Sequence, residues 1–187
     1  MDAFEYLSVL ISIVLGLALT RLLAEAARLI QVRRRVRVYW PVLVWMFSLL
    51  LILVQSWWAL FDFRDHQGWT LLQFALILAH PTLLYLLCVL LLPDAGTDGE
   101  IDLRANYFDQ APWFFASAAA FTIFSALRPL VFDGALPLDA DRLFHLGFLA
   151  VALLCMVQRN ERLHQLAALT VPISVSAYAG LLFFRLT

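Results

Sequence analysis

The residue best placed for chemistry is His80, which lies near the middle of the apolar segment 69–92. Pro81 follows it, and a proline inside a helix deprives the carbonyl of Ile77 of its usual N–H donor. Gln73 precedes His80 by seven residues and falls on the same helical face. Ionisable side chains at membrane depth are costly and often mark ion or substrate pathways. These residues predict a site for a proton, a cation or a polar solute, and a neutral imidazole that fixes helix packing is the alternative.

Polar side chains on other apolar segments extend this candidate site. Gln55 lies on the second segment, and Ser174 shares a helical face with Tyr178 on the last. Arg21 and Arg128 stand near the C-terminal ends of their segments, where an arginine complements the helix dipole and reaches the interface. Close helix packing is the first explanation for the hydroxylated residues, and a polar conduit is the second. The predicted binding or conduction residues are His80, Gln73, Pro81, Gln55, Ser174, Tyr178, Arg21 and Arg128.

No cofactor or metal is predicted from the histidines, cysteines and acids. A b-type haem held by His80 and His145 is the alternative, but their positions along the segments do not place them at one depth. The acidic turn that begins at Asp94 imitates a calcium-binding loop, yet Ala105 stands where the bidentate glutamate belongs. The chain also lacks the motifs of phosphate-binding loops, zinc proteases and serine hydrolases, so an enzyme is the less favoured class.

The segments that must position these residues have the composition of a membrane protein. The chain has 187 residues, of which 63% are hydrophobic and 14% charged, and its mean hydropathy is +0.84. Soluble domains are nearer half apolar and a quarter charged. Apolar runs of about 20 residues are long enough to cross the hydrocarbon core as helices. The sequence predicts one all-α domain, a bundle of six transmembrane helices at about 4–24 (continuing to 30), 41–61, 69–92, 112–132, 142–158 and 163–184.

The six segments could form two inverted halves of three helices each. The segment 6–23 aligns without a gap on 113–130, and this alignment superposes Arg21 on Arg128. The third segment of each half carries a proline followed by a tyrosine. Transporters are commonly built from inverted repeats of this kind. Chance similarity between leucine-rich helices is the competing explanation.

The distribution of arginine predicts how the chain is oriented. Eight arginines lie in or beside the connections after the first, third and fifth segments, and three lie on the other side. The positive-inside rule places the first group in the cytoplasm, which puts both termini on the periplasmic side of a bacterial inner membrane. The net charge of −1 gives no general attraction to nucleic acid. The basic run is predicted to set this topology and to contact anionic lipids through Arg33, Arg34, Arg35 and Arg37.

Three functional classes stay open at this point. The first is a small transporter or channel with a mid-membrane polar site around His80. The second is a non-catalytic membrane subunit, sensor or effector component that acts through a protein partner. The third is a membrane enzyme or haem redox protein, which only the scattered histidines favour. The many apolar helix faces, together with the small interior of six short helices, also predict a homo-oligomer.

The predicted orientation can be tested with single cysteines at two glycines. A cysteine in place of Gly96 should be protected from a membrane-impermeant thiol reagent in intact cells, because its loop belongs to the arginine-rich side. A cysteine in place of Gly134 should react readily. The opposite labelling pattern would reverse the orientation.

Overall fold

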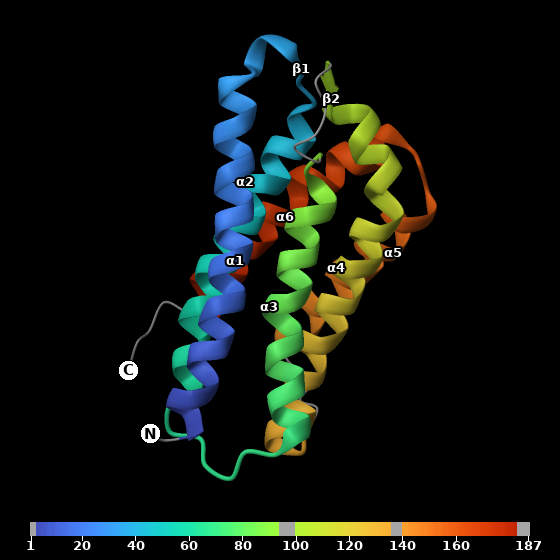
Figure 1. The fold of residues 1–187 in the computed structure, drawn as a ribbon. Helices are drawn as coiled ribbons and strands as arrows, with labels where there is room; N and C mark the ends of the chain where they lie inside the picture. Colours follow the sequence, from blue (N-terminus) through green and yellow to red (C-terminus); the bar gives the residue numbers. More distant parts are fainter. Residues whose placement is uncertain (1–2, 94–99, 136–139, 183–187) are drawn as a thin grey trace.

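The structure is a computed structural model that describes residues 3–93, 100–135 and 140–182. Long helices run up and down one bundle, with the N-terminus at one end (Figure 1). We call this end the N-terminal end and the opposite one, which carries two short strands, the strand end. The helices are α1 (Ala3–Gln31), α2 (Trp40–Ala59), α3 (Leu71–Leu91), α4 (Leu103–Asp133), α5 (Ala140–Val157) and α6 (Glu161–Leu182). The short elements are η1 (Arg33–Arg35), β1 (Val36–Arg37), η2 (Leu60–Phe63) and β2 (Ile101–Asp102).

Local signals in the sequence account for the helix ends. Pro41 occupies the first turn of α2, where its missing N–H has no intrahelical partner to lose. The Asp102 carboxylate accepts hydrogen bonds from two backbone N–H groups at the start of α4, at 2.9 Å each. Gly134 ends the same helix in the left-handed conformation, with φ of 67°, which glycine adopts at low cost. Helix α2 thus begins within one residue of the predicted segment 41–61, whereas α4 begins well before the predicted start at about 112.

The fourth helix is longer than the sequence predicts, because it begins at Leu103 rather than at about 112. Pro112 therefore lies inside it. The stretch before Pro112 resembles a loop in hydropathy, yet it forms the first turns of α4 and packs in the core through Leu103, Tyr107 and Ala111, each at most 2% exposed. The N-cap at Asp102 starts it there. The turn predicted not to bind calcium falls mostly at 94–99, outside the described residues.

The connections after α1, α3 and α5 meet at the strand end. Strands β1 and β2 pair in parallel, with Val36 opposite Ile101. Arg37 lies 3.6 Å from the Asp102 carboxylate, and Arg104 binds Glu161 at the start of α6 with an N–O distance of 2.8 Å. The hydrogen bond from Arg104 holds the pKa of Glu161 below its usual value. The grouping of these connections agrees with the sequence, although it does not tell which side of a membrane they face.

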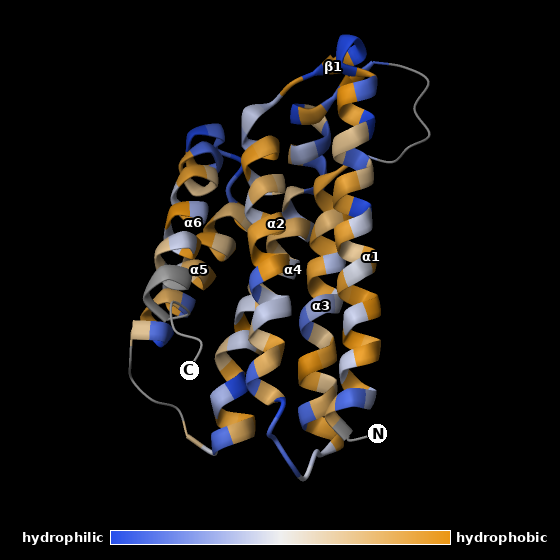
Figure 2. Ribbon diagram, turned by 90° about the vertical axis from the view of Figure 1, so that its left-hand side faces the viewer, coloured by the Kyte–Doolittle hydropathy of each residue, from blue (hydrophilic) through white to orange (hydrophobic). Residues whose placement is uncertain are grey.

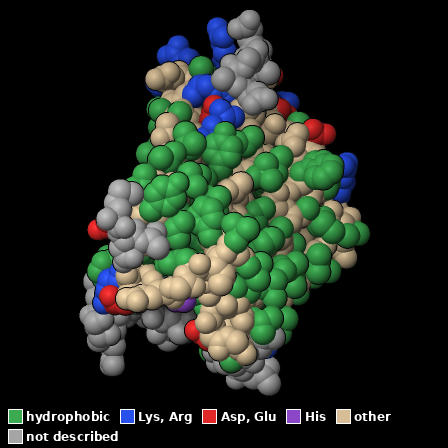
Figure 3. Space-filling model, turned by 60° about the horizontal axis from the view of Figure 1, so that its bottom comes forward, with side chains coloured by type: hydrophobic (Ala, Val, Ile, Leu, Met, Phe, Trp, Pro, Cys, Tyr) green, Lys and Arg blue, Asp and Glu red, His purple; other side chains and the backbone are tan. Residues whose placement is uncertain are grey.

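Among the described residues, five helices are long and apolar enough to cross a membrane, namely α1, α2 with η2, α3, α4 and α5. Hydrophobic residues dominate the middle of the bundle, while hydrophilic residues gather toward its ends (Figure 2). In the view tilted toward the N-terminal end, hydrophobic side chains cover most of the visible face (Figure 3). Large apolar residues such as Ile13 and Leu17 are more than half exposed, as lipid-facing residues of a membrane helix would be. A sixth span and the inverted repeat are not confirmed: α1 packs mainly on α3, whereas α4 packs on α3 and α5.

A buried carboxylate joins α1 to the strand end of α3. Glu25 is only 3% exposed and accepts hydrogen bonds from Arg21 at 2.9 Å and from Arg28 at 2.6 Å. Arg28 also donates to the backbone carbonyl of Pro93, just after α3, at 3.3 Å. The spacing of Arg21, Glu25 and Arg28 by four and three residues puts all three on one face of α1. The structure shows, in addition, that this stripe is buried against a neighbouring helix.

Replacing this carboxylate should destabilise the fold. In Glu25→Gln, the two arginines lose their shared anion, and the free energy of unfolding should fall by about 2–3 kcal/mol because breaking a buried ion pair leaves charge uncompensated. Glu100→Gln is the matched control, since Glu100 is exposed at the same end. The measurement is denaturant unfolding in detergent micelles. Equal midpoints for the two variants would show that the ion cluster adds nothing to stability.

Candidate functional site

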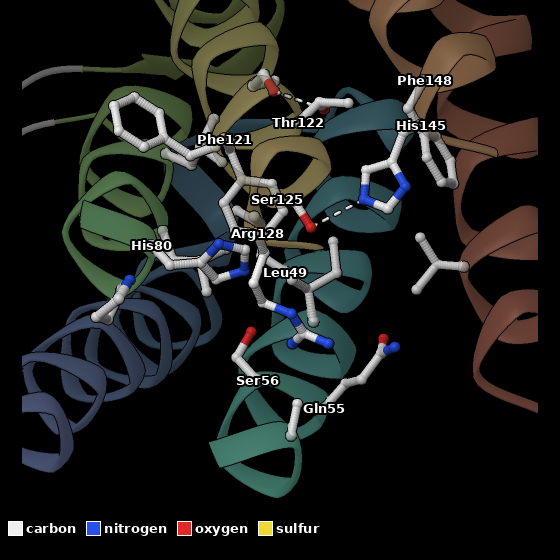
Figure 4. Close-up of a pocket in the computed structure, with 18 of the residues that line it drawn as sticks. Leu49, Gln55, Ser56, His80, Phe121, Thr122, Ser125, Arg128, His145 and Phe148 are labelled. Carbon is white, nitrogen blue, oxygen red and sulfur yellow. Dashed lines mark hydrogen bonds between the residues drawn. The ribbon is translucent and has the colours of Figure 1, made fainter. Parts of the chain in front are cut away.

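A pocket of about 220 Å³ lies inside the bundle, and all six helices contribute to its wall. Its lining extends from Trp45 on α2 and Leu87 on α3 toward Phe63 in η2 and His145 near the start of α5. Most of the wall is aliphatic or aromatic. We call it the His80 pocket, because the histidine singled out from the sequence lies on its wall (Figure 4).

Polar side chains from four helices converge in this pocket. His80 comes from α3, and Figure 4 shows Arg128 of α4 extending between it and Gln55 of α2. Ser125, one turn before Arg128, faces His145 of α5 across the pocket. A mostly apolar cavity with a few convergent polar groups is the usual form of a small-molecule site. The arrangement can therefore bind a ligand that has both an apolar body and a polar group.

His80 has an aromatic neighbour and a free polar edge. Its ring centroid lies 4.0 Å from that of Phe121 on α4, with the planes tilted by 41°. Within the described residues, neither of its ring nitrogens forms a hydrogen bond. The adjacent Pro81 also lines the pocket. One nitrogen of a neutral imidazole donates and the other accepts, so His80 can offer either to a ligand.

His145, in contrast, is held on both sides by protein atoms. Its Nδ1 lies 2.8 Å from the backbone oxygen of Asp141 and 3.5 Å from the Asp141 carboxylate, and its Nε2 lies 2.8 Å from the Ser125 hydroxyl. The sequence did not place His80 and His145 at one depth, but the structure puts both on one pocket wall. A haem iron could bind His145 only after one of these hydrogen bonds is given up.

Arg128 brings a permanent positive charge into the pocket. Its guanidinium carbon lies 5.3 Å from the ring centroid of Phe63, within the range of a cation–π contact. None of the described lining residues is an aspartate or a glutamate. Its predicted counterpart Arg21 is in a different situation, because it is bound to Glu25 and does not line the pocket. Arg128 is itself exposed, and its guanidinium contacts the Phe63 ring.

The other predicted site residues divide into those at the pocket and those elsewhere. Gln55, His80, Pro81 and Arg128 line it. Gln73 instead completes a capping box with Thr70 at the start of α3, and its amide nitrogen lies 3.4 Å from a backbone oxygen at the end of α4. Sequence reasoning missed this role because it started the helix two residues too early. Ser174 is not among the lining residues, and the side chain of Tyr178 lies outside the described part.

The structure adds polar residues that the sequence analysis did not select for this site. Thr122 and Ser125 line the pocket with Arg128, and their spacing of three residues puts them on one face of α4. That spacing was a signal available in the sequence. Ser56, beside Gln55, lines the pocket as well, and no pattern in the sequence marks it.

A layer of packed rings closes the pocket toward the strand end. We call it the aromatic layer, and its ring centroids lie within 6.5 Å of one another along a continuous chain of contacts. Phe114, Phe115 and Trp45 belong to both the layer and the pocket wall, and each is less than 7% exposed. The layer consists of Tyr39, Trp45, Tyr107, Phe108, Phe114, Phe115 and His164.

His164 is the polar centre of the aromatic layer. It has no exposed surface, and its Nε2 lies 2.8 Å from the Gln158 carbonyl while its Nδ1 lies 2.9 Å from the Tyr107 hydroxyl. A carbonyl can only accept, so Nε2 carries the hydrogen and Nδ1 of the neutral ring accepts from Tyr107. These two bonds tie α4, the α5–α6 connection and α6 together.

The fold and the site together define the class of this protein. Five apolar helices of membrane-spanning length, with polar residues gathered in an internal pocket, are the features of a multi-pass α-helical membrane protein. Comparison of the chain with protein-family models, with curated proteins and with solved structures gave no significant match. The functional argument therefore rests on the pocket itself.

Loss of one hydroxyl in the aromatic layer should weaken the fold. In Tyr107→Phe, Nδ1 of His164 loses its partner in a site without water-exposed surface, which costs about 1–3 kcal/mol of unfolding free energy. Tyr85→Phe removes a hydroxyl from an exposed tyrosine of α3 and serves as the control. Thermal unfolding of both variants in the same detergent gives the comparison. If Tyr107→Phe is as stable as the control, the Tyr107–His164 bond does not hold the layer together.

Proposed function

We propose that this protein is a small membrane transporter or channel whose binding site is the His80 pocket. The observation that carries the proposal is the convergence of His80, Arg128 and Gln55, from three different helices, inside one mostly apolar pocket. Polar groups of this kind are costly among membrane helices, and they are retained most often on substrate or ion pathways. A purely structural bundle has no need of an unpaired imidazole edge beside a guanidinium.

The helices around the pocket support movement of the bound solute as well as binding. Pro81 in α3, Pro129 in α4 and Pro172 in α6 all lie inside helices. An interior proline removes one backbone hydrogen bond and permits a bend at that position. In the conformation described here, the aromatic layer separates the pocket from the strand end. Passage through the bundle therefore requires this layer to open, and the interior prolines give the surrounding helices places to bend.

The environment of the protein belongs to the same proposal. We place the strand end, with its arginine-rich connections, in the cytoplasm of a bacterial inner membrane and both termini in the periplasm. Anionic lipids would then contact the basic run that includes η1, in which no residue is buried. Exposed aromatic and leucine faces on α2 and α5 give copies of the chain surfaces for a homo-oligomer.

A second candidate function is a non-catalytic subunit that works through a protein partner. It is favoured by the exposed basic turn η1 at the strand end, which could bind an acidic surface on such a partner. In this case the His80 pocket would respond to a ligand without passing it on. Transport measurements distinguish the two functions.

The transport proposal is tested by flux into proteoliposomes. Four radiolabelled probes represent the charge classes: benzoate and phosphate as anions, glutamine as a zwitterion and choline as a cation. At least one should enter faster than into protein-free liposomes. His80→Ala should then lower that flux at least several-fold, because the variant loses the imidazole nitrogens that can donate to or accept from the bound solute. The charged or titratable groups facing His80 from the pocket wall are Arg128 and His145.

His66→Ala is the matched control for this experiment. His66 lies in the connection between α2 and α3, packs on Trp69 and does not line the pocket. Its variant should keep the flux of the parent protein. An unchanged flux in His80→Ala would make His80 a packing residue. If none of the four probes moves under a concentration, voltage or pH gradient, transport is wrong and the partner-subunit function takes its place.

A further inference from the structure

We propose that the ligand of the His80 pocket is a monoanion with a compact apolar body, and that Arg128 binds its anionic group. This inference rests on the proposed function in one respect, since it concerns the same pocket. It specifies the chemistry of the ligand, which the transport proposal leaves open. The argument follows from the charges, the free polar atoms and the size of the pocket.

Arg128 is the arginine on the described wall of the pocket, and no acidic side chain accompanies it there. Acidic partners accompany the other arginines that form ion pairs: Arg21 and Arg28 share Glu25, Arg37 has Asp102, Arg64 has Asp65 and Arg104 has Glu161. Within the part of the chain that the structure describes, Arg128 forms no ion pair. The described pocket wall contains no carboxylate either. Arg128 is exposed and lines the pocket, so a ligand can reach its guanidinium, and an anionic ligand would supply the missing pair.

The groups around Arg128 suit an anionic head rather than a second cation. A guanidinium presents several N–H donors in a planar fork that matches a carboxylate or phosphate. The amide of Gln55 and the hydroxyl of Ser56 lie on the same side of the pocket and can donate to further oxygen atoms (Figure 4). His80 stands on the opposite side of the guanidinium with its ring nitrogens unbonded. An oxyanion placed among these groups would accept from each of them.

The rest of the pocket suits a small apolar body. Phe121 and Phe148 flank the polar groups, and Trp45, Phe114 and Phe115 form the wall farther toward the strand end. An apolar protein cavity of about 150 Å³ is large enough to hold benzene. The His80 pocket, at about 220 Å³, has room for one ring or a short chain together with its anionic group. Such a ligand is either a water-soluble aromatic acid or a short fatty acid released from lipid.

The experiment measures equilibrium binding, not flux, with the full chain in nanodiscs of zwitterionic phosphatidylcholine. The probes are radiolabelled 3-phenylpropionate for the soluble acid and decanoate for the lipid-derived acid. At least one should bind saturably. The neutral 3-phenylpropionamide and the cationic 3-phenylpropylamine should fail to displace it at concentrations where the unlabelled acid displaces it fully. The acid that binds more tightly identifies the source, and either preference supports the proposal.

Arginine variants connect this binding to Arg128. Arg128→Gln should weaken binding at least about tenfold, because the charge-assisted hydrogen bonds to the anion are lost. Arg128→Lys keeps the charge and should retain part of the affinity. Arg64→Gln is the matched control: Arg64 also lies over a phenylalanine ring near the N-terminal end, but it has an acidic partner and is not in the pocket. Its affinity should equal that of the parent protein.

Three results would overturn the proposal. They are the absence of saturable binding of both acids to the parent protein, unchanged affinity in Arg128→Gln, and displacement by the amine as effective as by the acid. The displacement series uses the unmodified protein, so it decides the question even if a variant fails to fold. Binding without flux would contradict the transport function and support the proposed ligand class. Flux of choline or glutamine without binding of either acid would support the transport function and contradict the proposed ligand class.

Discussion

The need to satisfy polar groups inside an apolar bundle governs most of this structure. A charge or a hydrogen-bonding group that leaves water must find its partner within the protein, because lipid offers none. Glu25 meets this requirement with two arginines of its own helix, and His164 meets it with a hydroxyl and a carbonyl. Each set of bonds also joins separate elements. The polar groups that are costly to bury thus determine how the apolar helices are arranged relative to one another.

The requirement is not met everywhere in the bundle. At the strand end, Glu25 and His164 have their partners, whereas the Tyr39 hydroxyl and the Trp45 indole N–H of the aromatic layer are buried without a hydrogen bond among the described residues. In the pocket below the layer, His80 and Arg128 have polar atoms directed into open space. The pocket groups differ from the buried groups of the layer because they border open space, so a ligand can reach them and supply the missing hydrogen bonds.

Much of the fold could be predicted from the sequence, because length and hydropathy dictate helices in this composition. The start of α2 followed from Pro41. Consecutive helices run in opposite directions, so the connections after α1, α3 and α5 were expected to lie at the same end of the bundle, as they do. The start of α4 was wrong because hydropathy was taken as a measure of helicity. A helix can continue through residues of mixed hydropathy when its cap, here Asp102, stands farther back and one of its faces packs in the core. Hydropathy locates the apolar zone, whereas caps locate the helix ends.

The site was harder to predict, because convergence in space depends on how helices rotate and cross. His80 and Arg128 were identifiable as costly residues in apolar segments, but the sequence treated Arg128 and Arg21 as equivalents. The difference between them comes from one neighbour: Arg21 has Glu25 one turn away, and no acid stands one turn from Arg128 on α4. A charge count along each helix would therefore have separated a structural arginine from a candidate ligand-binding one. Where the helix itself supplies no counter-charge, the bundle must provide it, or the arginine remains available to an anion.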